Sequence, residues 1–118
     1  MILVDTSVWI DHFRQGLPEL AESLRRREVV MHPYIVGELA CGNFSNRQAT
    51  LELLQQLRSV GVAEHDEVMN FIRVRRLHGR GIGYVDVHLL AAATIAGYRL
   101  WTVDKRLNSV ASSLGVAC

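Results

Sequence analysis

Short, uniformly apolar runs alternate along this chain with longer segments in which apolar residues recur at helical spacing. The short runs predict strands at 2–4, 29–31 and 99–103, and their lack of polar alternation is typical of strands buried on both faces. The longer segments between them predict helices. This alternation favours an α/β fold with a central, mainly parallel sheet.

Capping and breaking residues bound the expected helices. The hydroxyls of Thr6 and Ser7 are expected to cap the first helix, Gly16 to end it, and Pro18 and Pro33 to occupy first helical turns. The 86–97 segment is so rich in alanine and leucine that we expect a buried core helix there. The start and stop signals place the helices between 6–16, 18–27, 33–42, 46–58, 66–79, 86–97 and 104–115, with two further short strands at 60–63 and 116–117.

The length and composition predict one domain covering residues 1–118. Of the 118 residues, 49% are hydrophobic, which suffices for a core without disulfides or a structural metal. Cys41 and Cys118 form no metal-binding or disulfide pattern, so a reducing, cytoplasmic environment is expected. No apolar run approaches the roughly 18 residues of a membrane span, and no basic signal segment precedes Ile2, so we predict no membrane association.

The net charge of +1 does not by itself indicate a nucleic-acid-binding protein. The basic residues are nevertheless clustered, at Arg25–Arg27, in the stretch from Arg73 to Arg80, and at Lys105–Arg106. Each cluster is explained either as a solvated helix face or as part of a basic rim that holds phosphates. The glycines of 81–83 lack the full dinucleotide-binding pattern and follow a predicted helix instead of a strand.

Four acidic residues lie within or at the edge of apolar runs: Asp5, Glu38, Asp86 and Asp104. Asp5 and Asp104 each follow a predicted strand, at the carboxyl edge of the sheet where ligands bind in α/β folds. Each Asp could alternatively be only a helix N-cap. Glu38 lies inside a helix among apolar neighbours, so capping does not explain it, and we expect it to be buried with a partner.

Electrostatics limits how these acids can coexist in one pocket. Carboxylates about 5 Å apart repel by roughly 3 kcal/mol per pair at an effective dielectric constant near 20, so several pairs would cancel the stability of a domain. Either protons or a divalent cation must compensate the charge, and an all-oxygen ligand set favours Mg²⁺ or Mn²⁺. Such a site suits hydrolysis of phosphodiester bonds.

Four blocks of sequence resemble one protein family. They are the opening segment 1–10, the Glu38–Gly42 segment, Asp86 before its alanine-rich helix, and the closing segment 97–104. In this order and over nearly the whole chain they resemble the PIN-domain ribonucleases, and among them the VapC-type toxins of bacterial type II toxin–antitoxin pairs.

The resemblance implies a three-layer α/β/α PIN-like domain and a metal-dependent endoribonuclease. Asp5, Glu38, Asp86 and Asp104 would be its catalytic, metal-binding acids, and Ser7 or Thr102 would orient ligands or water. The cofactor would be Mg²⁺, or Mn²⁺, and the partners would be an RNA substrate, a cognate antitoxin and a second copy of the chain in a homodimer.

Arg106 departs from the family pattern, because many relatives have a further acid at this position. The number of metal ions therefore stays open between one and two. For Arg106 itself, two interpretations remain: contact with an RNA phosphate, or a solvent-facing place on its helix.

Two other functions compete with the nuclease. A phospho-accepting receiver domain has a similar size and an acidic Mg²⁺ pocket, but it would need paired acids after the first strand, where Thr6 and Ser7 follow Asp5. A PIN-like domain that only binds is the second alternative. The five histidines lack the spacing of a zinc site or of a histidine-based ribonuclease, and His88 is expected to serve the core or support the acids.

Overall fold

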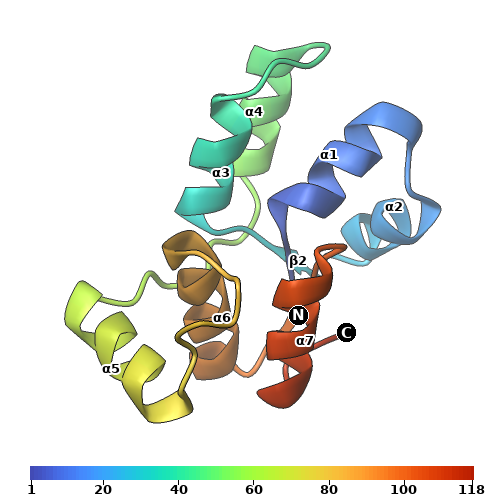
Figure 1. The fold of residues 1–118 in the computed structure, drawn as a ribbon. Helices are drawn as coiled ribbons and strands as arrows, with labels where there is room; N and C mark the ends of the chain where they lie inside the picture. Colours follow the sequence, from blue (N-terminus) through green and yellow to red (C-terminus); the bar gives the residue numbers. More distant parts are fainter.

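The computed structural model describes residues 1–118 (Figure 1). A three-stranded parallel sheet forms the centre of the molecule. Its strands are β1 (Ile2–Val4), β2 (Val29–Val30) and β3 (Arg99–Trp101), in the order β2-β1-β3. Leu3 of the central strand is paired with Val30 on one side and with Leu100 on the other. The first and last strands of the chain are therefore neighbours, and their carboxyl ends lie at the same edge.

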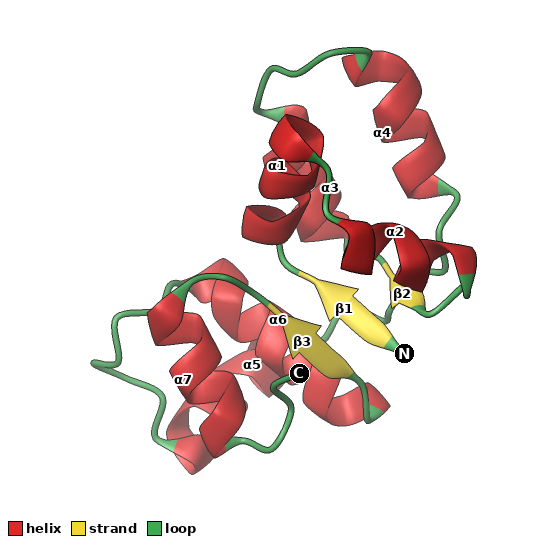
Figure 2. Ribbon diagram, turned by 90° about the vertical axis from the view of Figure 1, so that its right-hand side faces the viewer, coloured by secondary structure: helices red, strands yellow, loops and turns green.

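Seven helices cover the sheet, on both of its sides. Figure 2 shows the strands between one group of helices, α1 to α4, and a second group, α5 to α7. This arrangement confirms the predicted α/β class with helices flanking a parallel sheet. None of the helices is long and apolar enough to cross a membrane. The helices are α1 (Thr6–Gln15), α2 (Pro18–Arg25), α3 (Pro33–Ala40), α4 (Arg47–Gln55), α5 (His65–Arg75), α6 (Tyr84–Ala96) and α7 (Lys105–Ser113).

The core joins β1 to the alanine-rich helix. Leu3 and Val4 are fully buried, and every residue of α6 from Val87 to Ala93 is buried as well. This confirms that α6 is a core helix, as its composition predicted. Both cysteines are free and exposed.

The structure corrects three local predictions. Segments 60–63 and 116–117 are not strands: each region contributes only a single parallel bridge, Met31 with Ser59 and Leu100 with Ala117. After Val60 the chain becomes exposed and leaves the sheet edge to reach α5, so no ladder can continue. Helix α6 begins at Tyr84 and not at Asp86, because Gly83 occupies the N-cap position.

The third correction concerns the start of α1. Thr6 and Ser7 do not cap this helix, whose N-cap position is occupied by Asp5 without any side-chain capping hydrogen bond. Both hydroxyls instead donate to carboxylates, that of Ser7 to Asp5 and that of Thr6 to Glu38. The two residues therefore hold acidic side chains in place instead of capping the helix.

Candidate active site

The ends of four elements bring the predicted acids to one edge of the sheet. Asp5 lies between β1 and α1, and Asp104 precedes α7 shortly after β3. Asp86 lies in the first turn of α6, and Glu38 in the second half of α3. Because β1 and β3 are parallel neighbours, Asp5 and Asp104 emerge at the same carboxyl edge, as predicted.

Asp5 is the most enclosed of the four acids. It is only 7% exposed, and its Oδ2 accepts hydrogen bonds from Ser7 Oγ (2.7 Å) and Thr102 Oγ1 (2.8 Å). A buried carboxylate is costly unless it is hydrogen-bonded, so these two hydroxyls stabilise its charged form. Ser7 and Thr102, inferred from the family resemblance as orienting residues, therefore contact Asp5 directly.

Thr102 also connects Asp5 to Asp104. The backbone N–H of Asp104 donates to Thr102 Oγ1 (3.0 Å), and the hydroxyl of Thr102 donates to Asp5 Oδ2. The Oδ1 atom of Asp104 accepts from the N–H of Leu107 (3.0 Å). The capping interpretation thus holds for Asp104, which caps α7, but not for Asp5, whose carboxylate makes no capping bond to α1.

Glu38 is exposed, so the expectation that it would be buried is wrong. The apolar residues around it in sequence, such as Ile35 and Leu39, face the core, while Glu38 faces away from it. The expected partner does exist: Thr6 Oγ1 donates to Glu38 Oε1 at 2.7 Å. We had not assigned Thr6 to the site, and its place directly after Asp5 was the only sequence signal for this role.

Asp86 carries the clearest sign of crowded negative charge. Burial raises the pKa of its half-buried carboxyl group above the ordinary value of 3.8, and the charges of Asp5 and Asp104 raise the pKa further. A hydrogen bond from the N–H of Gly83 to Asp86 Oδ2 (3.1 Å) acts in the opposite direction. Asp5, Asp86 and Asp104 therefore interact electrostatically across the site.

The four carboxylates do not form a compact cluster. Nowhere in the chain do three or more His, Cys, Asp or Glu side chains form a group that could hold a metal ion in the present arrangement. Each of the four acids nevertheless has one oxygen fixed by a hydrogen bond, from Ser7 and Thr102, Thr6, Gly83 or Leu107, and one oxygen with no hydrogen bond. Four hard oxygen donors of this kind fit Mg²⁺ or Mn²⁺.

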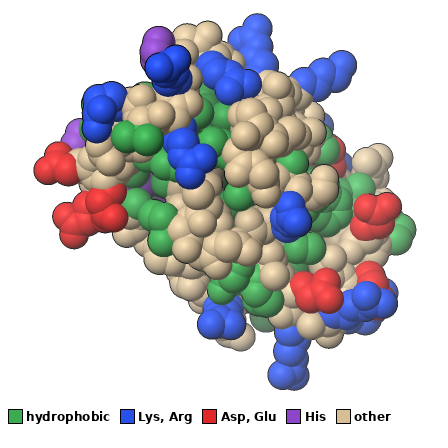
Figure 3. All heavy atoms as spheres, turned by 90° about the horizontal axis from the view of Figure 1, so that it is seen from below, with side chains coloured by type: hydrophobic (Ala, Val, Ile, Leu, Met, Phe, Trp, Pro, Cys, Tyr) green, Lys and Arg blue, Asp and Glu red, His purple; other side chains and the backbone are tan.

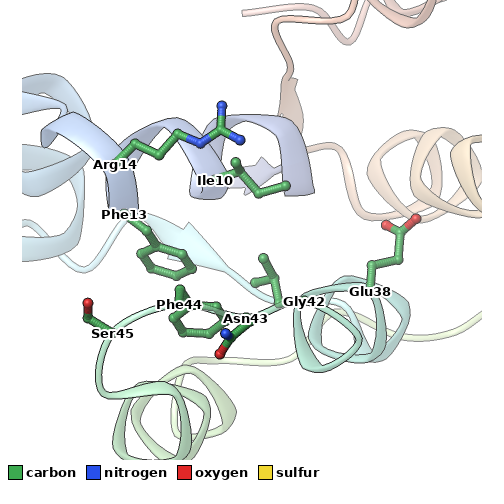
Figure 4. Close-up of a pocket in the computed structure, with 9 residues that line it drawn as sticks. Ile10, Phe13, Arg14, Glu38, Gly42, Asn43, Phe44 and Ser45 are labelled. Atoms are coloured by element: carbon green, nitrogen blue, oxygen red, sulfur yellow. The ribbon is translucent and has the colours of Figure 1, made fainter.

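A cavity of about 420 Å³ adjoins the acids through Glu38. Its lining comes from α1, α3 and the segment that follows α3, and the rings of Phe13 and Phe44 stack within it at 4.7 Å (Figure 4). Arg14 and Asn43 add polar groups. An apolar surface with a carboxylate at one side is therefore open next to the site, and no motif in the sequence indicated it.

The histidines lie outside this arrangement of carboxylates. His88 is buried, both of its ring nitrogens lack hydrogen bonds, and the rings of Tyr34 and Tyr84 pack against it at 4.7 Å. Burial, together with the charge of His88, lowers the pKa of the equally buried His32 to about 4. Both histidines are thus neutral side chains in the protein interior near pH 7, and the core role expected for His88 is confirmed.

The chain is similar in sequence and in fold to known proteins. The model of the PIN-domain family matches residues 2–112. Ribonuclease VapC32 from two strains of Mycobacterium tuberculosis, CDC 1551 / Oshkosh and ATCC 25618 / H37Rv, is 48% identical over 118 residues, covering 99% of this chain and 95% of the relative. The crystal structure of PAE2754 from Pyrobaculum aerophilum has the same fold, with a TM-score of 0.68 at 16% identity, over 97% of this chain and 94% of that one.

The raised pKa of Asp86 leads to a stability prediction. When a carboxyl group has a higher pKa in the folded state than in the unfolded state, the free energy of unfolding falls as the pH rises through that pKa. A neutral Asn causes no such fall. In EDTA at pH 7, Asp86→Asn should therefore unfold at an equal or higher temperature than the wild type. The difference should shrink as the pH falls toward 3.8, the ordinary pKa of the group.

Thermal unfolding monitored by circular dichroism measures this difference. Asp66→Asn is the matched control, because Asp66 lies in the first turn of α5 outside the site and its charge favours that helix. This control should be unchanged or slightly less stable. Marked destabilisation by Asp86→Asn alone would show that the carboxylate serves the fold and not a cation site.

Proposed function

The chain belongs to the PIN-domain family, and within it to the VapC-type ribonucleases, and we propose that it is a Mg²⁺- or Mn²⁺-dependent endoribonuclease toxin that acts in the cytoplasm. The ribonuclease class follows from 48% identity over nearly the whole length of a ribonuclease. The family match over residues 2–112 supports a single domain covering 1–118. The observation that carries the metal-dependent mechanism is the convergence of Asp5, Asp86 and Asp104 at one edge of the sheet, where burial raises the pKa of Asp86 and the charges of Asp5 and Asp104 raise it further.

Asp5, Glu38, Asp86 and Asp104 would hold the cation through the oxygens that make no hydrogen bonds. A bound divalent cation of this kind lowers the pKa of water and offsets negative charge on phosphate oxygens. The chain's own contribution is orientation: Ser7 and Thr102 fix Asp5, and Thr6 fixes Glu38. Hydrolysis would leave 5′-phosphate and 3′-hydroxyl ends on the RNA.

The two alternative functions find less support. The match to the PIN-domain family excludes a receiver domain. A domain that only binds RNA would have no need of four carboxylates, each with an oxygen left free at one edge of the sheet. Their retention, together with the high identity to a ribonuclease, favours catalysis.

The cavity beside Glu38 suggests how an antitoxin would inhibit the enzyme. We propose that an apolar segment of the antitoxin fills this cavity, against Phe13 and Phe44, and that a basic side chain reaches the acids. Such a partner would cover the site and compensate its charge in place of the cation.

The homodimer implied by the family resemblance remains part of this proposal, and sedimentation of the purified protein tests it.

Cleavage of RNA tests the proposed activity. The purified protein should cut RNA when Mg²⁺ or Mn²⁺ is present and should stop in EDTA. Asp86→Asn should lower the rate by about 100-fold or more, the scale expected when one preorganised electrostatic group is lost. Gel analysis of a labelled RNA measures the rate, and Asp66→Asn should cleave like the wild type. Equal cleavage by the wild type, by Asp86→Asn and by the EDTA-treated sample would refute the metal-nuclease proposal.

Titration with the antitoxin tests the role of the cavity. Phe44→Ala should cleave RNA normally but require about tenfold more antitoxin for half inhibition, because a lost aromatic contact at an interface costs at least about 1.4 kcal/mol. Ile95→Ala removes an exposed apolar side chain from α6, outside the cavity, and should behave as the wild type. Identical inhibition curves for Phe44→Ala and the wild type would show that the antitoxin binds elsewhere.

A further inference from the structure

Arg106 is a cation without a partner at the edge of the acidic site. It lies in the first turn of α7, two residues after Asp104, and is exposed. The chain has two ion pairs, and both are formed by Glu22 with other arginines. The guanidinium of Arg106 forms no ion pair and donates no hydrogen bond within the protein. A guanidinium carries N–H donors and a positive charge, so a side chain of this kind without a partner in the protein can bind an anion.

Gly81 determines where this guanidinium lies. A Cβ atom on Gly81 would be 2.7 Å from Arg106 Cδ, 3.0 Å from Nη1 and 3.2 Å from Nε, so the arginine lies directly on the glycine backbone. Gly81 also has a φ of +78°, which side chains rarely allow. Gly79, in the same loop, has a similar φ of +70° but nothing within 4 Å of its Cβ position. The contact is thus specific to Gly81, and we call it the Gly81–Arg106 contact.

The Gly81–Arg106 contact connects the two helices that carry Asp86 and Asp104. Gly81 lies two residues before Gly83, whose N–H donates to Asp86, while Arg106 follows Asp104 on α7. A second contact, from Arg80 Nη1 to Ser113 Oγ (3.3 Å), holds the same loop against the other end of α7. Arg106 is therefore packed against the loop that leads to Asp86, and its guanidinium forms no ion pair with either acid.

On one face of the molecule the basic side chains are dispersed. Figure 3 shows lysine and arginine side chains scattered over the underside of the molecule, with apolar side chains exposed between them and no single continuous basic patch. The net charge is only +1. The overall charge of the protein would therefore attract RNA only weakly, so the affinity for RNA depends on individual cations that contact phosphates.

We propose that Arg106, positioned by Gly81, binds a phosphate of the RNA next to the bond that the acidic site cleaves. A guanidinium matches a phosphate through paired N–H···O contacts, and an arginine already held against the backbone loses less freedom on binding. The inference deepens the proposed function and rests on RNA being the substrate. Binding through Arg106 requires no metal, so it can be measured separately from cleavage.

Binding of a fluorescently labelled single-stranded RNA of mixed sequence, measured by anisotropy in EDTA at several salt concentrations, tests the proposal. Arg106→Gln should weaken binding and lower the slope of log Kd against log salt concentration by about 0.7, the value for one phosphate contact on a single strand. Arg106→Lys should keep the slope but bind less tightly. Arg58→Gln removes an equal charge near Met1, at the opposite end of β1, and should leave the slope unchanged.

Substitution of Gly81 and Gly79 tests whether the position of Arg106, as well as its charge, matters for RNA binding. Gly81→Ala should weaken RNA binding because it displaces Arg106, whereas Gly79→Ala, with similar backbone strain but no contact, should not. In the double variant Gly81→Ala/Arg106→Gln, the glycine change should add nothing to the loss caused by Arg106→Gln, because Gly81 acts only through Arg106. Additive losses would show that Gly81 has another role and would overturn its part in the proposal.

The outcomes distinguish this inference from the proposed function. Equal affinity and equal salt slope for Arg106→Gln and the wild type would overturn the role of Arg106, even if the protein cleaves RNA. A wild type that binds no RNA in EDTA would overturn it as well. If the protein binds RNA through Arg106 but does not cleave it in the presence of metal, the nuclease proposal is refuted and the phosphate site is supported.

Discussion

The hydrogen bonds that enclose Asp5 are the constraint on which the rest of the site depends. A carboxylate only 7% exposed is tolerated because Ser7 and Thr102 donate to the same oxygen. Ser7 is local, but Thr102 comes from the far end of the chain and also accepts the N–H of Asp104. Stabilising one buried charge therefore fixes the carboxyl end of β3 and the start of α7 beside β1. The geometry of the acidic edge follows from that connection.

Much of this arrangement could be predicted from the sequence. Parallel strands ending in Asp5 and before Asp104 are visible as apolar runs, and the carboxyl edge of an α/β sheet is where such residues meet. Glu38 was misplaced, because apolar neighbours along a helix say nothing about which face a residue between them occupies. The sequence places the start of the alanine-rich helix at Asp86, but the helix begins at Tyr84 with Gly83 at the N-cap. Both errors concern orientation within a turn, which packing decides.

Individual side-chain contacts between distant segments could not be predicted. Nothing local to Gly81 indicates that an arginine from α7 lies on its backbone, and nothing local to Phe44 indicates a stack with Phe13. The cavity adjoins Glu38, and Arg106, two residues after Asp104, packs on the loop that leads to Asp86. The fold itself is shared with PAE2754 at only 16% identity, so the features that distinguish this enzyme are side chains placed around a common frame.

The central claim is that carboxylates from four separate elements form one cation site. It is tested most directly by anomalous diffraction at the manganese absorption edge from crystals soaked in Mn²⁺. We expect a manganese peak bounded by Asp5, Asp86 and Asp104, on the side of Glu38, and loss of that peak in Asp5→Asn crystals. A wild-type crystal with no peak at this edge of the sheet, or with manganese bound only elsewhere, would refute the proposed cation site.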